Sequence, residues 1–310
     1  MELHSKIFVI GHTGQLGNAL VEKLISLGYK NVITRRHSEL DFNVQQEVER
    51  FFREEKPEYV FYCAGSLGNI NYFKSNGASV VYDNIIMQAN AIKFAGEYGV
   101  KKFMYIGSGA VYGNNLESPF NEEHSIESIQ QGGMEPYAVA KIAGLEMCKQ
   151  FNGYNGCKYI AVLPTHIYGT KNIKRIKNGL IETTIKILHE AKKQNIDTVS
   201  LDIWGTGKKS VRQFLYIDDV VEAMLYFMES YTDDMPVNIS TDEAVSLDDM
   251  VKTVSSIVGY LGNISYQYDK PENGAQRLLS TKKMKSLGWN PKFSLHDGIR
   301  DFYRWYCSNQ

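Results

Sequence analysis

The sequence predicts an α/β protein, with a Rossmann-type doubly wound parallel sheet followed by a smaller mixed α/β C-terminal lobe. Over residues 1–165, short apolar runs alternate with amphipathic helical patterns, an alternation that produces parallel strands joined by helical crossovers. After Gly169 the rhythm changes to a basic loop and shorter, less regular signals. A chain of 310 residues has room for one large domain and a smaller lobe.

Glycine and proline set the expected element boundaries. The first helices should end at Gly28, before Pro57 and at Gly99, because these residues stop helices. In the first part we expect strands at 7–10, 31–34, 59–63, 102–106 and 159–163, and helices at 17–27, 44–55, 80–98 and 136–151. In the second part we expect helices at 180–194 and 295–306. The resulting domains are 1–168 and 169–310, with some segments of the second returning to the first.

Composition excludes several classes of function. The net charge of -1 provides no overall basic field for a nucleic acid or an acidic membrane. No apolar run reaches the ~18–20 residues of a membrane-spanning helix, and the N-terminal residues lack a signal-peptide layout. The four cysteines form no CxxC pair, so we expect reduced thiols, a cytoplasmic protein and no metal site.

A glycine-rich loop follows the first expected strand. Gly11, Gly14 and Gly17 form a GxxGxxG pattern directly before the first helix. Glycines there permit a tight turn and let backbone N–H groups approach a pyrophosphate at the helix N-terminus. The alternative is a plain strand-to-helix turn. The position of the loop within an N-terminal βαβ unit favours a dinucleotide.

The loop after the second expected strand bears on the choice of cofactor. Arg35 and Arg36 stand where an NAD-specific enzyme places an acid. Two arginines there suit a 2′-phosphate, which favours NADPH/NADP as the cofactor. The alternative is that both are solvated surface residues. Further along, Asp41 and Phe42 could border the adenine. Ala64 and Gly65 end the third strand with small side chains that leave room beside the cofactor.

A phenol and an ammonium four residues apart form the candidate catalytic pair. Tyr137 and Lys141 share one face of the expected helix at 136–151, and Ser108 follows the strand at 102–106. A free tyrosine has a pKa near ~10, so a nearby cation that favours the phenolate would help it exchange protons near neutrality. Ser108 is placed to hydrogen-bond the same substrate oxygen.

With these residues identified, the chain resembles the extended short-chain dehydrogenase/reductase superfamily, and within it the GDP-L-fucose synthases. The matching segments run nearly end to end, over residues 11–17, 40–55, 107–113, 135–144, 164–169, 204–219 and 270–289. The resemblance implies reduction of a 4-keto nucleotide sugar. In it Ser108 orients the carbonyl, Tyr137 protonates the C4 oxygen, and Lys141 binds the ribose and lowers the tyrosine pKa.

Two departures from that family concern the epimerisation of C3 and C5. The family uses a cysteine two residues after the serine and a histidine at the start of the helix after the basic loop. Here these positions are Ala110 and Gly179 or Leu180, and neither replacement can exchange a carbon-bound proton. Thr13 also replaces a family arginine in the glycine loop. We therefore expect a C4 reductase without the epimerase step.

The expected binding residues extend into the second part of the chain. Pro164 and His166 lie in the segment that lines the nicotinamide in this superfamily, although His166 fits a structural histidine equally well. The expected cofactor set is Gly11, Thr13, Gly14, Gln15, Leu16, Gly17, Arg35, Arg36, Asp41, Phe42, Ala64, Gly65, Tyr137, Lys141, Pro164 and His166. The expected substrate set is Ser108, Ala110, Tyr137, Lys177, Trp204, Arg212 and Arg277, with the two arginines suited to a diphosphate. A buried core position for Trp204 and a solvated charge run around Lys177 are the alternatives.

The sequence thus predicts an NADPH-dependent reductase of a GDP-linked 4-keto hexose or heptose for surface-polysaccharide precursor synthesis. A complete fucose-synthase-type epimerase/reductase and an NAD-retaining 4-epimerase are the enzymatic alternatives, and an NADP(H)-sensing protein is the non-enzymatic one. A 4,6-dehydratase is disfavoured, because the segment 108–110 lacks the acids it would need. By resemblance only, a homodimer would form through the helices at 80–98 and 136–151.

Overall fold

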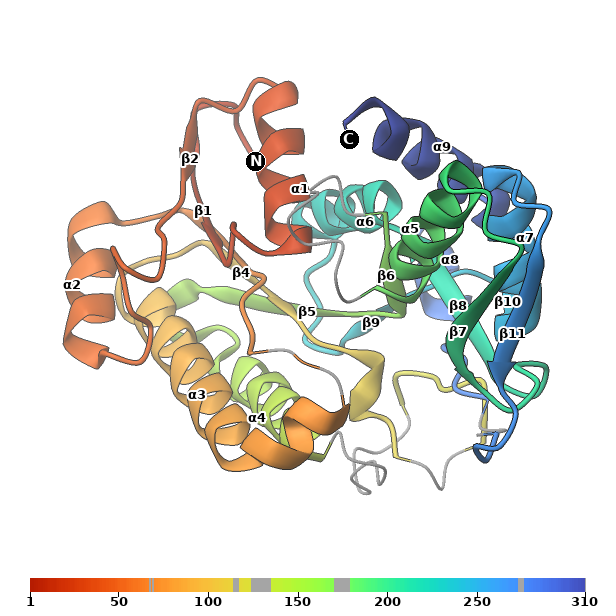
Figure 1. Ribbon diagram of the computed structural model, residues 1–310. Helices are drawn as coiled ribbons and strands as arrows, with labels where there is room; N and C mark the ends of the chain where they lie inside the picture. Colours follow the sequence, from red (N-terminus) through yellow and green to blue (C-terminus); the bar gives the residue numbers. More distant parts are fainter. Residues whose placement is uncertain are drawn as a thin grey trace. The chain divides into compact units, whose positions relative to one another are not determined.

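The computed structural model describes residues 1–66, 68, 70–113, 117–123, 135–169, 179–272 and 276–309 (Figure 1). The chain forms two compact units, and neither is one continuous stretch. The first comprises Met1–Leu116, Asn121–Pro164 and Val221–Ile239, and the second comprises Glu117–Phe120, Thr165–Val220 and Ser240–Gln310. The main division falls just before the expected boundary at residue 168, and the segment after Val220 returns to the first unit.

A parallel sheet forms the centre of the first unit. Its strand order is β2-β1-β3-β4-β5-β9, and each neighbouring pair is parallel. The strands are β1 (Lys6–Ile10), β2 (Asn31–Ile33), β3 (Tyr59–Tyr62), β4 (Lys102–Ile106), β5 (Lys158–Pro164) and β9 (Val237–Ile239). The order in which strands are added reverses at β1, because β2 lies on one side of it and β3 on the other. In open α/β sheets, ligands bind at the carboxyl ends of the strands at such a switch point.

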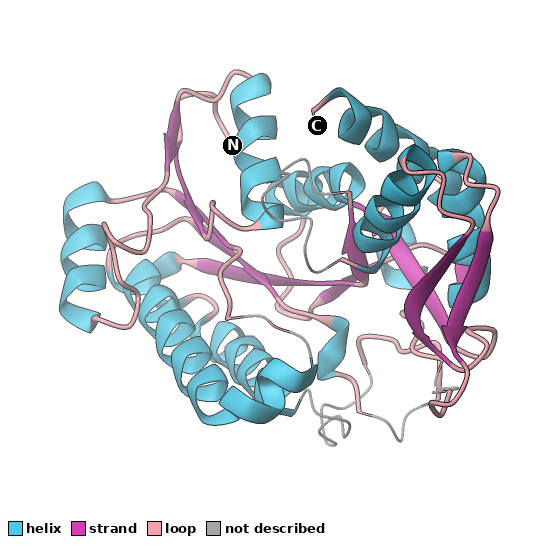
Figure 2. Cartoon of the chain, viewed as in Figure 1, coloured by secondary structure: helices cyan, strands magenta, loops and turns pink. Residues whose placement is uncertain are grey.

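Helices cover both faces of this sheet. They are α1 (Gln15–Ser26), α2 (Gln45–Glu55), α3 (Ile70–Glu97), α4 (Glu135–Phe151) and α6 (Ile217–Ser230), with the short 3₁₀ helices η1 (Gly109–Val111) and η2 (Tyr154–Gly156). Figure 2 shows α3 and α4 on one side of the strands, with α1 and α6 on the other. Lys23 of α1 and Glu222 of α6 form an ion pair at 3.5 Å.

The expected start of the third helix, at residue 80, is wrong. Helix α3 begins at Ile70 and passes through Asn76, whose backbone leaves helical geometry (φ -125°, ψ 21°). The Asn76 side-chain amide donates to the carbonyl of Tyr72, which satisfies an acceptor at the kink. The helix therefore continues through a segment in which Asn76 and Gly77 indicate a break.

Aromatic side chains dominate the core of the first unit. Phe8 of β1 packs against Phe51 of α2, with ring centroids 4.5 Å apart. Aromatic pairs of this kind fill the space between the sheet and its helices.

A lysine is buried in the central strand β4. All five residues of β4 are buried, including Lys102. The Lys102 ammonium donates to the carbonyls of Phe227 and Met228 at 3.2 and 2.5 Å, near the C-terminal end of α6. Burial lowers the pKa of Lys102 to about 8, and these carbonyls satisfy its N–H groups.

The second unit has two small sheets and four helices within its described residues. One sheet has the order β10-β8-β6, in which β8 is antiparallel to β10 and parallel to β6, and the other pairs β11 with β7 in parallel. The strands are β6 (His166–Tyr168), β7 (Thr198–Trp204), β8 (Val211–Tyr216), β10 (Ala244–Ser246) and β11 (Asn263–Gln267). The helices are α5 (Leu180–Lys193), α7 (Leu247–Val258), α8 (Lys282–Ser286) and α9 (Leu295–Ser308). Among all helices that the structure describes, none combines the length and apolar character of a membrane span.

Candidate active site

The glycine loop joins β1 to α1 through backbone contacts too close for side chains. Gly11 has φ +83°, and a Cβ there would lie 2.7 Å from the backbone nitrogen of Ala64. A Cβ on Gly17 would lie 2.4 Å from the carbonyl oxygen of Gly11. Both glycines are therefore required, because the loop folds tightly against itself and against the end of β3.

The N-terminus of α1 suits an anionic group. Gly14 is its N-cap residue, no described side chain caps it, and its first turn contains no acid. Exposed N–H groups and the helix dipole favour a phosphate at such a terminus. Thr13 of this loop is exposed, while Gln15 and Leu16 are half-buried. The loop thus fits the pyrophosphate of a dinucleotide.

The two arginines after β2 differ in their surroundings. Arg35 forms an ion pair with Glu55 at 2.6 Å, and its guanidinium lies 5.3 Å from the ring centre of Phe51. Arg36 is exposed, and its charge helps to lower the pKa of His12 in the glycine loop, after the larger effect of burial. Arg36 is thus the arginine whose charge reaches the glycine loop, whereas Arg35 is held against α2.

The Asp41–Phe42 pair serves the structure of its own loop. The Asp41 carboxylate accepts from the backbone N–H of Asn43 at 2.9 Å and from its side chain at 3.1 Å. Phe42 is 8% exposed, and its ring stacks on Phe8 with centroids 6.2 Å apart. The ring of Phe42 therefore belongs to the core, so a contact with the adenine would have to come from its backbone or its neighbours.

A buried asparagine fixes the loop after β3. The Asn84 side chain on α3 accepts from the Ser66 N–H at 2.8 Å and donates to the Ser66 carbonyl at 3.2 Å. A Cβ on the neighbouring Gly65 would lie 3.3 Å from the Asn84 oxygen and 4.0 Å from the Lys141 ammonium. The small residues Ala64 and Gly65 thus lie between the glycine loop and Lys141.

Ser108, Tyr137 and Lys141 come together in the first unit, as their spacing predicts. Ser108 follows β4 and caps η1, where its hydroxyl accepts from the N–H of Ala110 at 3.2 Å. The Ser108 side chain lies close enough to Tyr137 to lower the pKa of its hydroxyl. Lys141 lies one turn after Tyr137 on α4, with its ammonium 5.7 Å from the centre of the Tyr137 ring.

Burial and the neighbouring serine act in opposite directions on the pKa of Tyr137. Burial raises the pKa of Tyr137 well above its usual value, and the neighbouring Ser108 side chain only partly opposes this. The Lys141 ammonium faces the Tyr137 ring and donates to the Ile106 carbonyl at 2.8 Å. Tyr137 is thus a protonated phenol at neutral pH, the form that can donate a proton.

An apolar cluster surrounds Tyr137. Phe73 of α3 stacks on Tyr137 with ring centroids 5.9 Å apart and an interplanar angle of 16°. Val80 completes the buried cluster, and Ala110 packs against it. Phe73 and Val80 were not predicted as site residues, because they belong to the part of α3 around its kink and carry no motif of their own.

In the second unit, two arginines lie near His166. The guanidinium of Arg277 lies 5.7 Å from the ring centre of Phe120. Burial lowers the pKa of both Arg212 and Arg277, and the charge of Arg212 lowers that of Arg277 further. His166 is exposed at the surface. Desolvation by the surrounding protein, followed by the positive charge of Arg212, lowers its pKa to about 4. His166 is therefore neutral beside a concentration of positive charge.

Trp204 lies at the surface, so its alternative as a core residue is wrong. Its side chain is 48% exposed, and its indole N–H donates to Asp202 at 3.2 Å. The Lys270 ammonium lies 5.0 Å from the centre of the ring. Next to it, the Glu272 carboxylate accepts from the Thr206 N–H and hydroxyl at 3.1 and 2.8 Å, two hydrogen bonds that no sequence pattern indicated.

Other expectations concern residues away from these clusters. Lys177 and the rest of the basic loop fall outside the described residues. Pro164, the last residue of β5, is buried. All four cysteines are free, and no group of three possible metal-binding side chains occurs within the described ranges.

Comparison with known proteins gives the family. Residues 7–240 match the model of the NAD dependent epimerase/dehydratase family. A putative GDP-L-fucose synthase 2 of Arabidopsis thaliana is 35% identical over 310 residues, which cover 100% of this chain and 94% of that protein. A GDP-mannoheptose C4 reductase from Campylobacter jejuni, solved with NADP bound, is 33% identical with a TM-score of 0.88 over 99% of each chain. A GDP-6-OMe-4-keto-L-xylo-heptose reductase from C. jejuni is 31% identical with a TM-score of 0.89, over 100% of this chain and 99% of that one.

These likenesses and the parallel sheet confirm both the Rossmann-type fold and the resemblance drawn from the sequence. The chain belongs to the NAD dependent epimerase/dehydratase family, within the extended short-chain dehydrogenases/reductases, and is an NAD(P)-dependent oxidoreductase.

Proposed function

We propose that this enzyme uses NADPH to reduce the C4 ketone of a GDP-linked 4-keto sugar, a 6-deoxyhexose or a heptose, without epimerising C3 or C5. The observation that carries the proposal is the apolar setting of Ala110 beside Tyr137, Phe73 and Val80. A methyl group there cannot exchange a proton with carbon, whereas the neighbouring Tyr137 can donate one to oxygen. The printed names of the two C. jejuni reductases support the same chemistry.

The roles of the three catalytic residues follow from their surroundings. Bound NADPH would supply the hydride for C4. Ser108 would hold the carbonyl oxygen by a hydrogen bond, and Tyr137 would give its phenolic proton to that oxygen as the alcohol forms. Because burial raises the pKa of Tyr137, the phenol is in the acid form required for reduction. Lys141 would bind the ribose hydroxyls and add a positive charge behind the phenol.

The preference for NADPH rests on Arg36. Its exposed guanidinium lies beside the glycine loop, where a 2′-phosphate would follow from a pyrophosphate at the N-terminus of α1. Arg35, which we also expected to contribute, pairs with Glu55. We assign the phosphate contact to Arg36 and a structural role to Arg35.

The GDP part of the substrate would bind to the second unit. Arg212 and Arg277 suit a diphosphate because guanidinium groups pair with phosphate oxygens in two-pronged fashion. The exposed ring of Trp204 offers a flat apolar surface for the base or the sugar. Neutral His166 can hydrogen-bond without adding charge.

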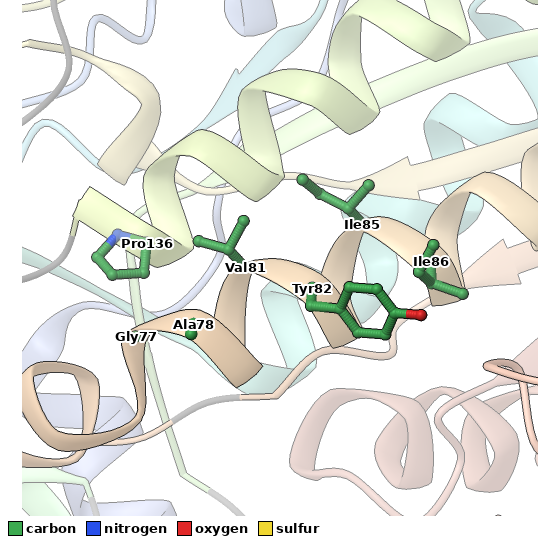
Figure 3. Close-up of a pocket in the computed structure, with 7 residues that line it drawn as sticks. All are labelled: Gly77, Ala78, Val81, Tyr82, Ile85, Ile86 and Pro136. Atoms are coloured by element: carbon green, nitrogen blue, oxygen red, sulfur yellow. The ribbon is translucent and has the colours of Figure 1, made fainter.

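The enzyme would act as a homodimer in the cytoplasm, in the synthesis of surface-polysaccharide precursors. An apolar groove on α3 and the start of α4 supports the dimer, and Figure 3 shows the side chains along it. Its lining residues are Gly77, Ala78, Val81, Tyr82, Ile85, Ile86 and Pro136. The four free thiols support a reducing compartment.

One reaction in D2O tests the proposal. Purified enzyme, NADPH and enzymatically generated GDP-4-keto-6-deoxymannose are mixed, absorbance is followed at ~340 nm, and the product is analysed by mass spectrometry. A GDP-linked 4-keto heptose is tested in parallel, and the Tyr137→Phe variant is the control. We expect NADPH oxidation with at least one of the sugars and no deuterium on carbon.

The other outcomes assign the alternatives. Oxidation with one or two carbon-bound deuterons would instead assign the epimerase/reductase activity that the name of the Arabidopsis relative suggests. Tight NADPH binding without oxidation by either sugar would favour the sensing protein. Conversion of a non-keto GDP-sugar to its C4 epimer without net NADPH use would favour the 4-epimerase.

A further inference from the structure

The ammonium of Lys141 is enclosed by three tyrosine rings. Its nitrogen lies 4.8 Å from the ring centre of Tyr105, 5.7 Å from that of Tyr137 and 5.9 Å from that of Tyr62. The Lys141 side chain is buried, with 4% of the residue exposed. Tyr137 belongs to the proposed chemistry, whereas Tyr62 on β3 and Tyr105 on β4 have no role in it.

Tyr105 makes the closest of these contacts and is held firmly in place. Its hydroxyl donates to the side-chain oxygen of Gln88 on α3 at 2.7 Å, and the Gln88 amide donates to the carbonyl of Ala140 on α4 at 2.6 Å. A Cβ on Gly144 would lie 2.3 Å from the Tyr105 oxygen, so α4 has a gap where the phenol fits. Tyr62 stacks on Tyr105 with centroids 5.7 Å apart at 15°.

The ring faces oppose the cost of burying a charge. Burial lowers the pKa of Lys141 to about 8, which would leave much of it neutral in mildly alkaline solution. The described ionisable groups that face it are Tyr62 at the end of β3 and Cys63 just after it, Tyr105 from β4, and Tyr137 and Cys148 from α4. All of them are neutral at pH 7, so ring faces and the Ile106 carbonyl are what stabilise the ammonium.

We propose that Tyr105 is a positioning residue, whose ring face holds the Lys141 ammonium charged and in place behind Tyr137. The inference rests on the proposed function for the importance of Lys141, but it concerns a property of the cofactor-free protein. A cation over an aromatic face gains more when it is desolvated, as it is here. Aliphatic side chains of similar size would fill the same space without stabilising the charge.

Direct titration of Lys141 in the cofactor-free enzyme tests the proposal. Lysine labelled with ¹³C at the ε carbon is incorporated, and the Lys141 resonance is assigned as the signal lost in Lys141→Met. Tyr105→Leu removes the ring, and Tyr105→Phe keeps the ring but loses the hydroxyl. We expect the Lys141 pKa to fall by about 0.5–1.5 units in Tyr105→Leu and to stay within ~0.3 units of wild type in Tyr105→Phe.

Two further variants show whether a shift in the Lys141 pKa comes from the lost ring or from a general loss of stability. Tyr159 on β5 is buried and donates to the Ile92 carbonyl at 2.7 Å, but its ring does not contact Lys141, so Tyr159→Leu is a matched control with no expected shift. Tyr62→Leu, which removes the more distant ring, should give a smaller shift in the same direction. It also keeps the test available should Tyr105→Leu fail to fold.

A kinetic measurement links the titration to turnover. Charged Lys141 is lost as pH rises through its pKa, so the alkaline limb of the kcat profile should move to lower pH in Tyr105→Leu and stay in place in Tyr105→Phe. An unchanged Lys141 pKa in Tyr105→Leu, or an equal shift in Tyr159→Leu, overturns the positioning role. Failure of every GDP-sugar to react with the wild type would refute the proposed function instead, and the titration would still decide the role of Tyr105.

Discussion

Tyr137 shows how one residue depends on both a local motif and its distant neighbours. Its spacing to Lys141 is visible in the sequence, and so is the serine after β4. Its stacking on Phe73 is not, because that contact joins two residues 64 positions apart in the chain, on different helices. The motif thus predicts which residues react, while the surrounding contacts determine the protonation state from which they start.

Replacement of Tyr137 by phenylalanine tests the proton transfer alone. The phenyl ring retains the stacking on Phe73, so folding and NADPH binding should stay close to wild type. We expect kcat to fall by about 10²–10⁴-fold, the usual contribution of a positioned proton donor. Stopped-flow NADPH oxidation measures kcat, and fluorescence titration measures the affinity. Wild-type turnover in this variant would exclude Tyr137 as the donor.

Replacement of the two neighbouring arginines should affect two different properties, NADPH affinity for Arg36 and stability for Arg35. Arg36→Ala should weaken NADPH binding by roughly 10- to 100-fold and leave NADH binding unchanged, because only NADPH carries the 2′-phosphate. Arg35→Ala should spare the cofactor preference and lower the free energy of unfolding by about 1 kcal/mol, since it loses the partly exposed Glu55 pair and the contact with Phe51. Cofactor titration and denaturant unfolding of both variants separate the two roles. An equal loss of NADPH affinity in both would contradict the assignment.

At the scale of elements, helix α3 serves two purposes. Its inner face carries Phe73, Asn84 and Gln88, which contact Tyr137, the loop after β3 and Tyr105. Its outer face carries Tyr82, which is 63% exposed, along the apolar groove (Figure 3). Any partner that packs on this groove therefore lies against a helix that also contacts Tyr137 and Tyr105.

Tyr82 provides the test of the dimer. Tyr82→Asp places a charge in the groove, so the protein should shift from about twice its mass of 35.2 kDa to that of a single chain. Tyr268 in the second unit is also 63% exposed, and Tyr268→Asp is the matched control. Sedimentation velocity distinguishes the two masses. A variant at Tyr82 that remains dimeric would require a different interface.

For the whole molecule, the sequence predicted what short-range patterns determine. The strand–helix alternation predicted a parallel sheet, and the glycine loop predicted which end of the sheet a dinucleotide would occupy. Other features depend on contacts between segments far apart in sequence. They are the pairing of Arg35 with Glu55, the exposure of Trp204 and the hydrogen bonds of Glu272 with Thr206. Such contacts follow from the packing of elements, which no local pattern encodes.

The return of Val221–Ile239 to the first unit has a consequence for synthesis on the ribosome. Strand β9 pairs with β5, and the carbonyls near the end of α6 accept from buried Lys102. A nascent chain that has just emerged to residue 168 therefore lacks the last strand of its sheet, and Lys102 lacks its acceptors. Nucleotide binding should accordingly mature only after the chain has been translated as far as Ile239, and a fragment cut at residue 168 is an incomplete sheet with an exposed edge.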